Sequence, residues 1–245
     1  ITGFSFQGRS NEFPNDKFNS SGLRLWFPGE VCSIDQLYCT NFRTAGIEVY
    51  GATPLNAGNV SVFDNVVAGV IFYSSGSTVN WNLLSGDDNG AMFACLNGYA
   101  DTGGGQINFD QIKNEAFVAS QGRCHRGQVI GYIEGQAGVN IGSVSGYAGA
   151  GYVDAAFIVD SRSPYYPPQN ASLRVGTFKS RHYRNMVMQL PGGAGGLTGH
   201  YFACQGDYFT DGFSWSSYGS GSFNWNVMTI PVNKVAHSCT ARVQF

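Results

Sequence analysis

A phrase that occurs twice constrains this chain more than any other feature of its sequence. Residues 89–101 read NGAMFACLNGYAD, and residues 198–211 read TGHYFACQGDYFTD. Each copy then leads through a Gly-x-Gly-x-apolar-Asn-aromatic stretch, at 103–109 or 219–225, to a second Cys. We therefore predict a duplication with β units at 44–126 and 127–245, after an N-terminal segment at 1–43. The two units are either separate domains or one continuous domain.

The repeat also suggests how the six cysteines pair. An even number of cysteines is typical of a disulfide framework formed in an oxidising compartment. Two cysteines that flank the same internal signature are expected to be bridged alike, and the remaining two then pair by elimination. The predicted disulfides are Cys95–Cys124, Cys204–Cys239 and a small N-terminal loop closed by Cys32–Cys39. They predict a protein that is secreted or displayed on an extracellular surface.

The composition favours an all-β protein. The chain has 34 Gly, 14% aromatic residues and 12% charged residues, against roughly 25% charged residues in an average soluble domain. Alternating runs such as 23–27, 47–50 and 225–230 suit strands with one buried face. Strand-like runs separated by turn residues predict a β-sandwich, jelly-roll or immunoglobulin-like, built from the two closely packed units. The best helix candidate is one short helix within 111–120.

Two classes of partner are not expected. The formal net charge is −2, which offers no basic face for nucleic acid. The longest apolar runs, such as 66–73, are eight residues long, well short of the roughly twenty that a membrane-spanning helix needs.

The second unit differs from the first by two insertions, and these carry the predicted binding site. They lie within 162–185 and 212–219 and are rich in aromatic and polar residues. Loops on a rigid β scaffold are a usual place for binding, and aromatic faces beside polar groups suit sugar rings and their hydroxyls. The alternative is that the aromatic residues only cover the edges of the sheets. The predicted ligand-binding residues are Tyr165, Tyr166, Asn170, Arg181, His182, Tyr183, His200, Asp207, Asp211, Trp215 and Tyr218.

The first unit has a different candidate, in the turn 85–91. Asp87, Asp88 and Asn89 present oxygen ligands of the kind that Ca²⁺ prefers. Their spacing is not that of an EF-hand loop, and a solvated turn is the alternative interpretation. No other cofactor is predicted.

These patterns favour a carbohydrate-binding, lectin-like adhesin or receptor-binding tip protein that recognises a glycan and is attached to a larger surface assembly. No catalytic residue is assigned, because the sequence contains no Gly-x-Ser-x-Gly elbow, phosphate loop or dinucleotide fingerprint. One alternative is a carbohydrate-active hydrolase or lyase on a jelly-roll fold, with Asp207 and Asp211 as its carboxylate pair. The other is a structural subunit of a coat, capsid or pilus.

Overall fold

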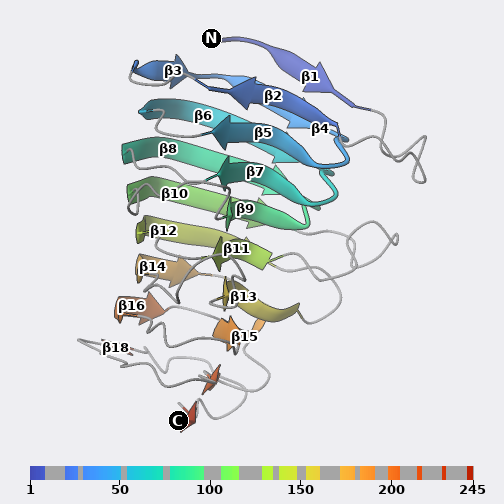
Figure 1. Ribbon diagram of the computed structural model, residues 1–245. Coiled ribbons are helices and arrows are strands. Elements are labelled where there is room, and N and C mark those ends of the chain that lie inside the picture. The colour runs from blue at the N-terminus through green and yellow to red at the C-terminus, as the bar shows by residue number, and fades with distance from the viewer. Residues whose placement is uncertain are drawn as a thin grey trace.

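A computed structural model of the chain contains strands, turns and bends (Figure 1). It describes residues 1–8, 20–26, 30–50, 54–73, 78–96, 106–115, 129–134, 138–147, 153–160, 172–179, 183–190, 198–204, 214–216, 228–229 and 242–244. Within these ranges there is no helix with the length and hydropathy that a membrane span needs.

The strands form two sheets that face each other, and the chain alternates between them except at β3 and β4, which follow each other in the same sheet. The 10-stranded sheet consists of β1 (Ser5–Gln7), β3 (Cys32–Ile34), β4 (Leu37–Thr40), β6 (Leu55–Phe63), β8 (Thr78–Asp87), β10 (Gln106–Glu115), β12 (Gly138–Tyr147), β14 (Ser172–Lys179), β16 (Thr198–Cys204) and β18 (Met228–Thr229). The 9-stranded sheet consists of β2 (Ser21–Leu25), β5 (Ala45–Tyr50), β7 (Ala68–Tyr73), β9 (Ala91–Leu96), β11 (Val129–Glu134), β13 (Val153–Asp160), β15 (Tyr183–Leu190), β17 (Ser214–Ser216) and β19 (Arg242–Gln244).

Every strand pairs in parallel with the strand one coil before or after it, so the fold is a parallel β-solenoid. Parallel neighbours require a long crossover connection, and here the strand of the opposite sheet provides it. The predicted β-sandwich is therefore wrong, because jelly-roll and immunoglobulin-like sandwiches are antiparallel. Alternating burial and frequent turns characterise both folds, which is why the sequence pattern did not separate them.

From β6 to β14 the coils lengthen while their register stays constant, and the register shifts only between β14 and β16 among these strands. Asn56, Asn80, Asn108, Asn140 and Arg174 occupy matching positions on successive strands of the 10-stranded sheet. The steps between them are 24, 28, 32 and 34 residues. The extra residues lie between the strands, so the ladder itself is not interrupted.

Aromatic side chains from both sheets meet in the core. Phe72 of β7 contacts Trp81 of β8 edge-on, with ring centroids 6.1 Å apart, and Phe109 of β10 lies 4.9 Å from Phe93 of β9. All four are at most 2% exposed. Above and below them, aliphatic residues such as Ile47 continue the core. Burial of this apolar column holds the two sheets together.

The predicted disulfide between Cys32 and Cys39 is also wrong. Cys32 pairs with Leu55 and Cys39 with Val62 of the same strand, β6. Seven residues of one strand separate these positions by about 23 Å, at roughly 3.3 Å per residue, whereas bridged Cα atoms lie within about 7 Å. Both are free thiols, and burial raises the pKa of Cys39 to about 12.

The other two predicted bridges involve residues outside the described ranges. Cys95 is buried on β9, and no disulfide joins it to another described cysteine. Its predicted partner Cys124 lies outside the described residues, as does Cys239. For Cys204, the backbone is described as part of β16. The structure thus gives no support to the disulfide framework.

The duplicated phrase does not mark equivalent places in the coil. Its first copy forms β9 in the 9-stranded sheet, and its second forms β16 in the 10-stranded sheet. Both sheets also continue across the predicted boundary at 126/127, since β9 pairs with β11 and β10 with β12. The division into two ancestral units stays a prediction, and the structural repeat is the shorter coil.

The helix predicted within 111–120 is wrong for its described part. Residues 111–115 belong to β10, whose inward-facing residues are Ile107, Phe109, Ile112 and Asn114. Strand pairing on both sides, with β8 and β12, outweighs the weak local helix preference.

Candidate functional site

The ligand-binding residues predicted from the insertions fall largely outside the described residues. Tyr165, Tyr166, Asn170, Arg181, His182, Asp207, Asp211 and Tyr218 are in this group. For the other three the backbone is described: Tyr183 begins β15, His200 lies in β16 and Trp215 lies in β17. These strands belong to two different sheets. The predicted insertion site stays a prediction.

The candidate calcium ligands lie at the end of β8, where the chain turns toward β9. Asp88 adopts a left-handed conformation with φ 52°, which Asp tolerates in turns. Asn89 is only 2% exposed, and its amide nitrogen donates to the Val62 carbonyl at 2.8 Å. Its side chain is therefore used inside the fold. Among the described residues, no three His, Cys, Asp or Glu side chains are grouped so that they could hold a metal ion.

Asn89 belongs to a buried ladder of turn asparagines. Asn65, one coil earlier, donates from its amide nitrogen to Asn89 Oδ1 at 2.8 Å and accepts from the backbone N–H of Phe42 at 3.1 Å. The backbone N–H of Asn65 donates to the same Asn89 oxygen at 3.2 Å. Backbone groups at a buried turn need such partners. The asparagines therefore connect successive coils, and sequence reasoning missed this role.

Asp87 lies half-buried beside other acidic groups at the same turn. Burial raises its pKa to about 6, and the charges of Glu115 and Asp88 act in the same direction. Asp64 adds a smaller effect, and Lys113 opposes the shift. Lys113 also forms an ion pair with Glu115, with Nζ 3.1 Å from Oε1.

The outer face of the 10-stranded sheet carries a regular row of asparagines. Asn80 Nδ2 donates to Asn56 Oδ1 at 3.2 Å, Asn108 Nδ2 to Asn80 Oδ1 at 3.0 Å, and Asn140 Nδ2 to Asn108 Oδ1 at 2.9 Å. We call these four residues the amide row. Asn56 and Asn80 are exposed, and the other two are half-buried. Each bond spans one coil, so the row runs across the strands.

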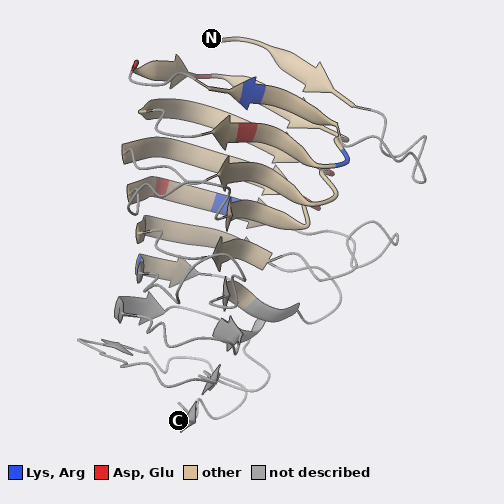
Figure 2. Ribbon diagram, in the orientation of Figure 1, with Lys and Arg blue, Asp and Glu red and all other residues tan. Residues whose placement is uncertain are grey.

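Further polar and aromatic groups lie on the same sheet. The hydroxyls of Ser61 and Ser85, one coil apart, are 2.9 Å from each other. Tyr38 stacks on Phe63 with ring centroids 5.0 Å apart, and Tyr38 is 42% exposed. Figure 2 shows only scattered charges on the described strands, and the members of the amide row are uncharged.

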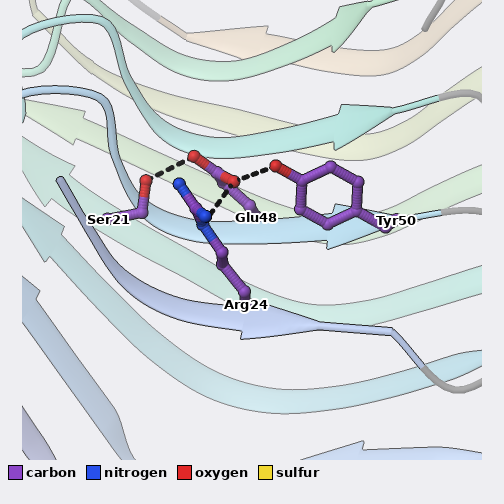
Figure 3. A network of polar contacts seen from close by, with 4 residues as sticks. All are labelled: Ser21, Arg24, Glu48 and Tyr50. Atoms are coloured by element: carbon purple, nitrogen blue, oxygen red, sulfur yellow. Dashed lines mark hydrogen bonds and ion pairs between the residues drawn. The ribbon is translucent and has the colours of Figure 1, made fainter. Parts of the chain in front are cut away.

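The 9-stranded sheet carries a second polar cluster near its N-terminal edge (Figure 3). Glu48 of β5 is 1% exposed. It accepts hydrogen bonds from the hydroxyls of Ser21 and Tyr50, and its Oε2 lies 3.0 Å from Nε of Arg24. Three partners therefore compensate the buried carboxylate, as buried charges require.

Two tyrosines extend this cluster along the sheet. Tyr50 stacks on Tyr73 of the next coil, with ring centroids 4.6 Å apart and an interplanar angle of 13°. Burial raises the pKa of Tyr50, and its hydrogen bond to Glu48 raises it further. Burial also raises the pKa of Tyr73. Both phenols therefore stay protonated near neutral pH.

The sequence does contain a signal for the amide row that the larger duplication concealed. The pattern apolar-Asn-apolar occurs at 55–57, 79–81, 107–109 and 139–141, at the start of each long strand. Asparagine is otherwise depleted in strands. Its recurrence between buried residues is typical of a side-chain ladder on stacked parallel strands.

The fold and these surfaces define the protein as a parallel β-solenoid with a regular, uncharged polar row on one outer face. No family model, curated protein or solved structure matches the chain.

Proposed function

We propose that the protein binds carbohydrate and that the amide row on the 10-stranded sheet contacts the glycan. The observation that carries this proposal is the hydrogen-bonded series Asn56, Asn80, Asn108 and Asn140. An asparagine amide has two N–H donors and an oxygen with two lone pairs. Within the row, Asn80 and Asn108 each use one donor and one lone pair on their neighbours. Each of these two residues therefore keeps one N–H donor and one oxygen lone pair for a ligand.

The geometry suits a linear, uncharged glycan that crosses the strands. Neighbouring members are one strand apart, about 4.8 Å, so the row offers a donor and an acceptor at regular intervals. Sugar hydroxyls donate and accept, which matches this alternation. The hydrogen bonds along the row fix the amide orientations before binding, which reduces the entropy lost on binding. Attachment to a larger surface assembly and an extracellular location remain proposals, and the free thiols of Cys32 and Cys39 remove part of the argument for that location.

A glycan array followed by titration calorimetry tests the proposal. We expect the protein to bind at least one uncharged glycan, and we expect the double variant Asn80→Ala/Asn108→Ala to bind it at least about fivefold more weakly. Two lost hydrogen bonds contribute about 1–3 kcal/mol, and about 1.4 kcal/mol is tenfold.

Asn82→Ala, which removes an exposed asparagine of β8 outside the amide row, is the matched control and should leave the affinity for this glycan unchanged. Absence of binding to any uncharged glycan would refute the proposal, as would equal affinity of the double variant and the original protein. The two alternative functions, a carbohydrate-active enzyme and a structural subunit, predict different experimental results. A hydrolase or lyase would release shorter products from the bound glycan, and an assembly subunit would sediment at a rate that depends on its concentration.

A further inference from the structure

The cluster around Glu48 has an outward-facing part that internal packing does not use. Arg24 is 60% exposed, although its Nε is held 3.0 Å from the buried Glu48 carboxylate. The guanidinium group is planar and carries five N–H donors. The ion pair with Glu48 is made through Nε and the side chain is 60% exposed, so the guanidinium group is accessible to a ligand from solvent.

An exposed aromatic residue, Trp26, follows directly after the end of β2. Trp26 follows Arg24 by two residues, and successive side chains of an extended strand alternate between faces. The burial agrees, because Leu25 between them is 1% exposed while Trp26 is 72% exposed. Arg24 on β2 and Trp26 just after its last residue are thus a cation and a large indole that are both exposed two residues apart.

We propose that Arg24 and Trp26 form a second saccharide subsite, which takes a sugar bearing a carboxylate. The carboxylate binds the terminal guanidinium nitrogens, a charge-assisted contact that is geometrically specific. The apolar face of the sugar ring packs on the indole. The inference rests on the proposed carbohydrate function but uses the opposite sheet and different chemistry, so each can fail alone.

The roles of the neighbouring groups follow from this geometry. Glu48 is a positioning residue, because it lies beneath the guanidinium and is itself almost inaccessible to solvent. The hydroxyls of Ser21 and Tyr50 hold the same carboxylate, so it stays bonded when Arg24 is replaced. Loss of the cationic partner of a buried carboxylate still lowers stability, so circular dichroism checks that Arg24→Gln is folded, and Arg24→Lys keeps the positive charge.

The probe is methyl β-D-glucuronide, and its methyl ester is the uncharged control with the same ring. Binding is followed through the indole N–H signals of the four tryptophans in two-dimensional NMR spectra of the labelled protein. We expect the acid to shift the Trp26 signal in a saturable way, with at least about fivefold weaker binding for the ester. The signal of the buried Trp81 should not move.

Arg24→Gln should lower the affinity for the acid to that for the ester, and Arg24→Lys should recover it only in part, because lysine cannot form the bidentate contact. Equal affinities for acid and ester would overturn the inference, and so would unchanged acid binding in Arg24→Gln. The Asn80→Ala/Asn108→Ala variant should bind the acid normally. If it does while binding no uncharged glycan, the two sites are separate. If the acid fails to bind and uncharged glycans still bind the amide row, only the subsite is refuted.

Discussion

Asp87 holds its proton more tightly in the folded protein than in the unfolded chain. Its pKa is raised to about 6 from an ordinary value of 3.8, first by burial and then by the nearby Glu115. Between these pH values the folded state binds more protons than the unfolded state. Linkage then requires the free energy of unfolding to fall as pH rises from about 4 to about 6.

The variant Asp87→Asn should lose this dependence, because an amide does not titrate in this range. We expect the difference in urea midpoint, variant minus original, to increase between pH 4 and pH 7 and to be constant above that. Asp110→Asn, at an exposed position of β10, is the control. A midpoint difference for Asp87→Asn that does not change with pH would contradict the raised pKa.

Residue identities alone could not reveal this shift or the role of Asn89. The sequence shows three adjacent polar residues, which suggest a solvated or cation-binding turn. Only the stacking of coils places Glu115 next to Asp87 and sends the Asn89 side chain toward the backbone of Val62. Both effects come from neighbours 24 or more residues away in the sequence.

At the scale of elements, the turns between the sheets are held by buried asparagines. Asn65→Ala leaves the buried Phe42 N–H without its acceptor and removes one of the two hydrogen bonds to Asn89 Oδ1, while the bond from the Asn65 backbone N–H remains. We expect a loss of about 3 kcal/mol in the free energy of unfolding, since one unsatisfied buried group costs about 1–3 kcal/mol. Chemical denaturation followed by circular dichroism measures it.

The exposed Asn82 of β8 is the matched position for this comparison. Asn82→Ala should change stability by less than about 0.5 kcal/mol, as is usual for surface positions. Equal effects of the two substitutions would show that the turn ladder does not stabilise the fold.

Strand positions were the most predictable elements and their arrangement the least. The alternation correctly indicated strands with a buried side at 23–25 and 47–50, whereas residue 26 follows the end of β2 and residue 27 lies outside the described residues. It carries no information on whether a neighbour runs parallel or antiparallel, because inward and outward positions alternate either way. The decisive signal was the recurrence of apolar-Asn-apolar at the first residues of β6, β8, β10 and β12, which is weaker than the duplicated phrase and easily overlooked.

At the scale of the molecule, the coils behave as interchangeable layers. Leu55 and Val79 are register partners 24 residues apart. Deleting residues 56–79 joins Leu55 to Asn80 and removes one whole coil. Leu55 then takes the place of Val79, so the same side chains as before point inward and outward. Because each repeat of a solenoid contacts only its neighbours, we expect a soluble protein with the β-type circular dichroism spectrum of the original chain and reduced stability.

Deleting one residue fewer, 57–79, places Asn56 where the fully buried Val79 lies. This variant should aggregate or remain unfolded, as judged by size-exclusion chromatography and circular dichroism. If both deletions behaved alike, register would not be the property that organises the molecule.

The pairing of each strand with only the preceding and following coils has a consequence for synthesis in the cell. A ribosome adds about 5–20 residues per second, so a coil of 24 residues takes about 1–5 s to emerge. Elementary strand pairing, as in a hairpin, takes about 1–10 μs. Each finished coil can thus serve as the template for the next one while the rest of the message is still untranslated. The nascent protein would then grow by docking successive layers, with a single uncovered edge that advances toward the ribosome.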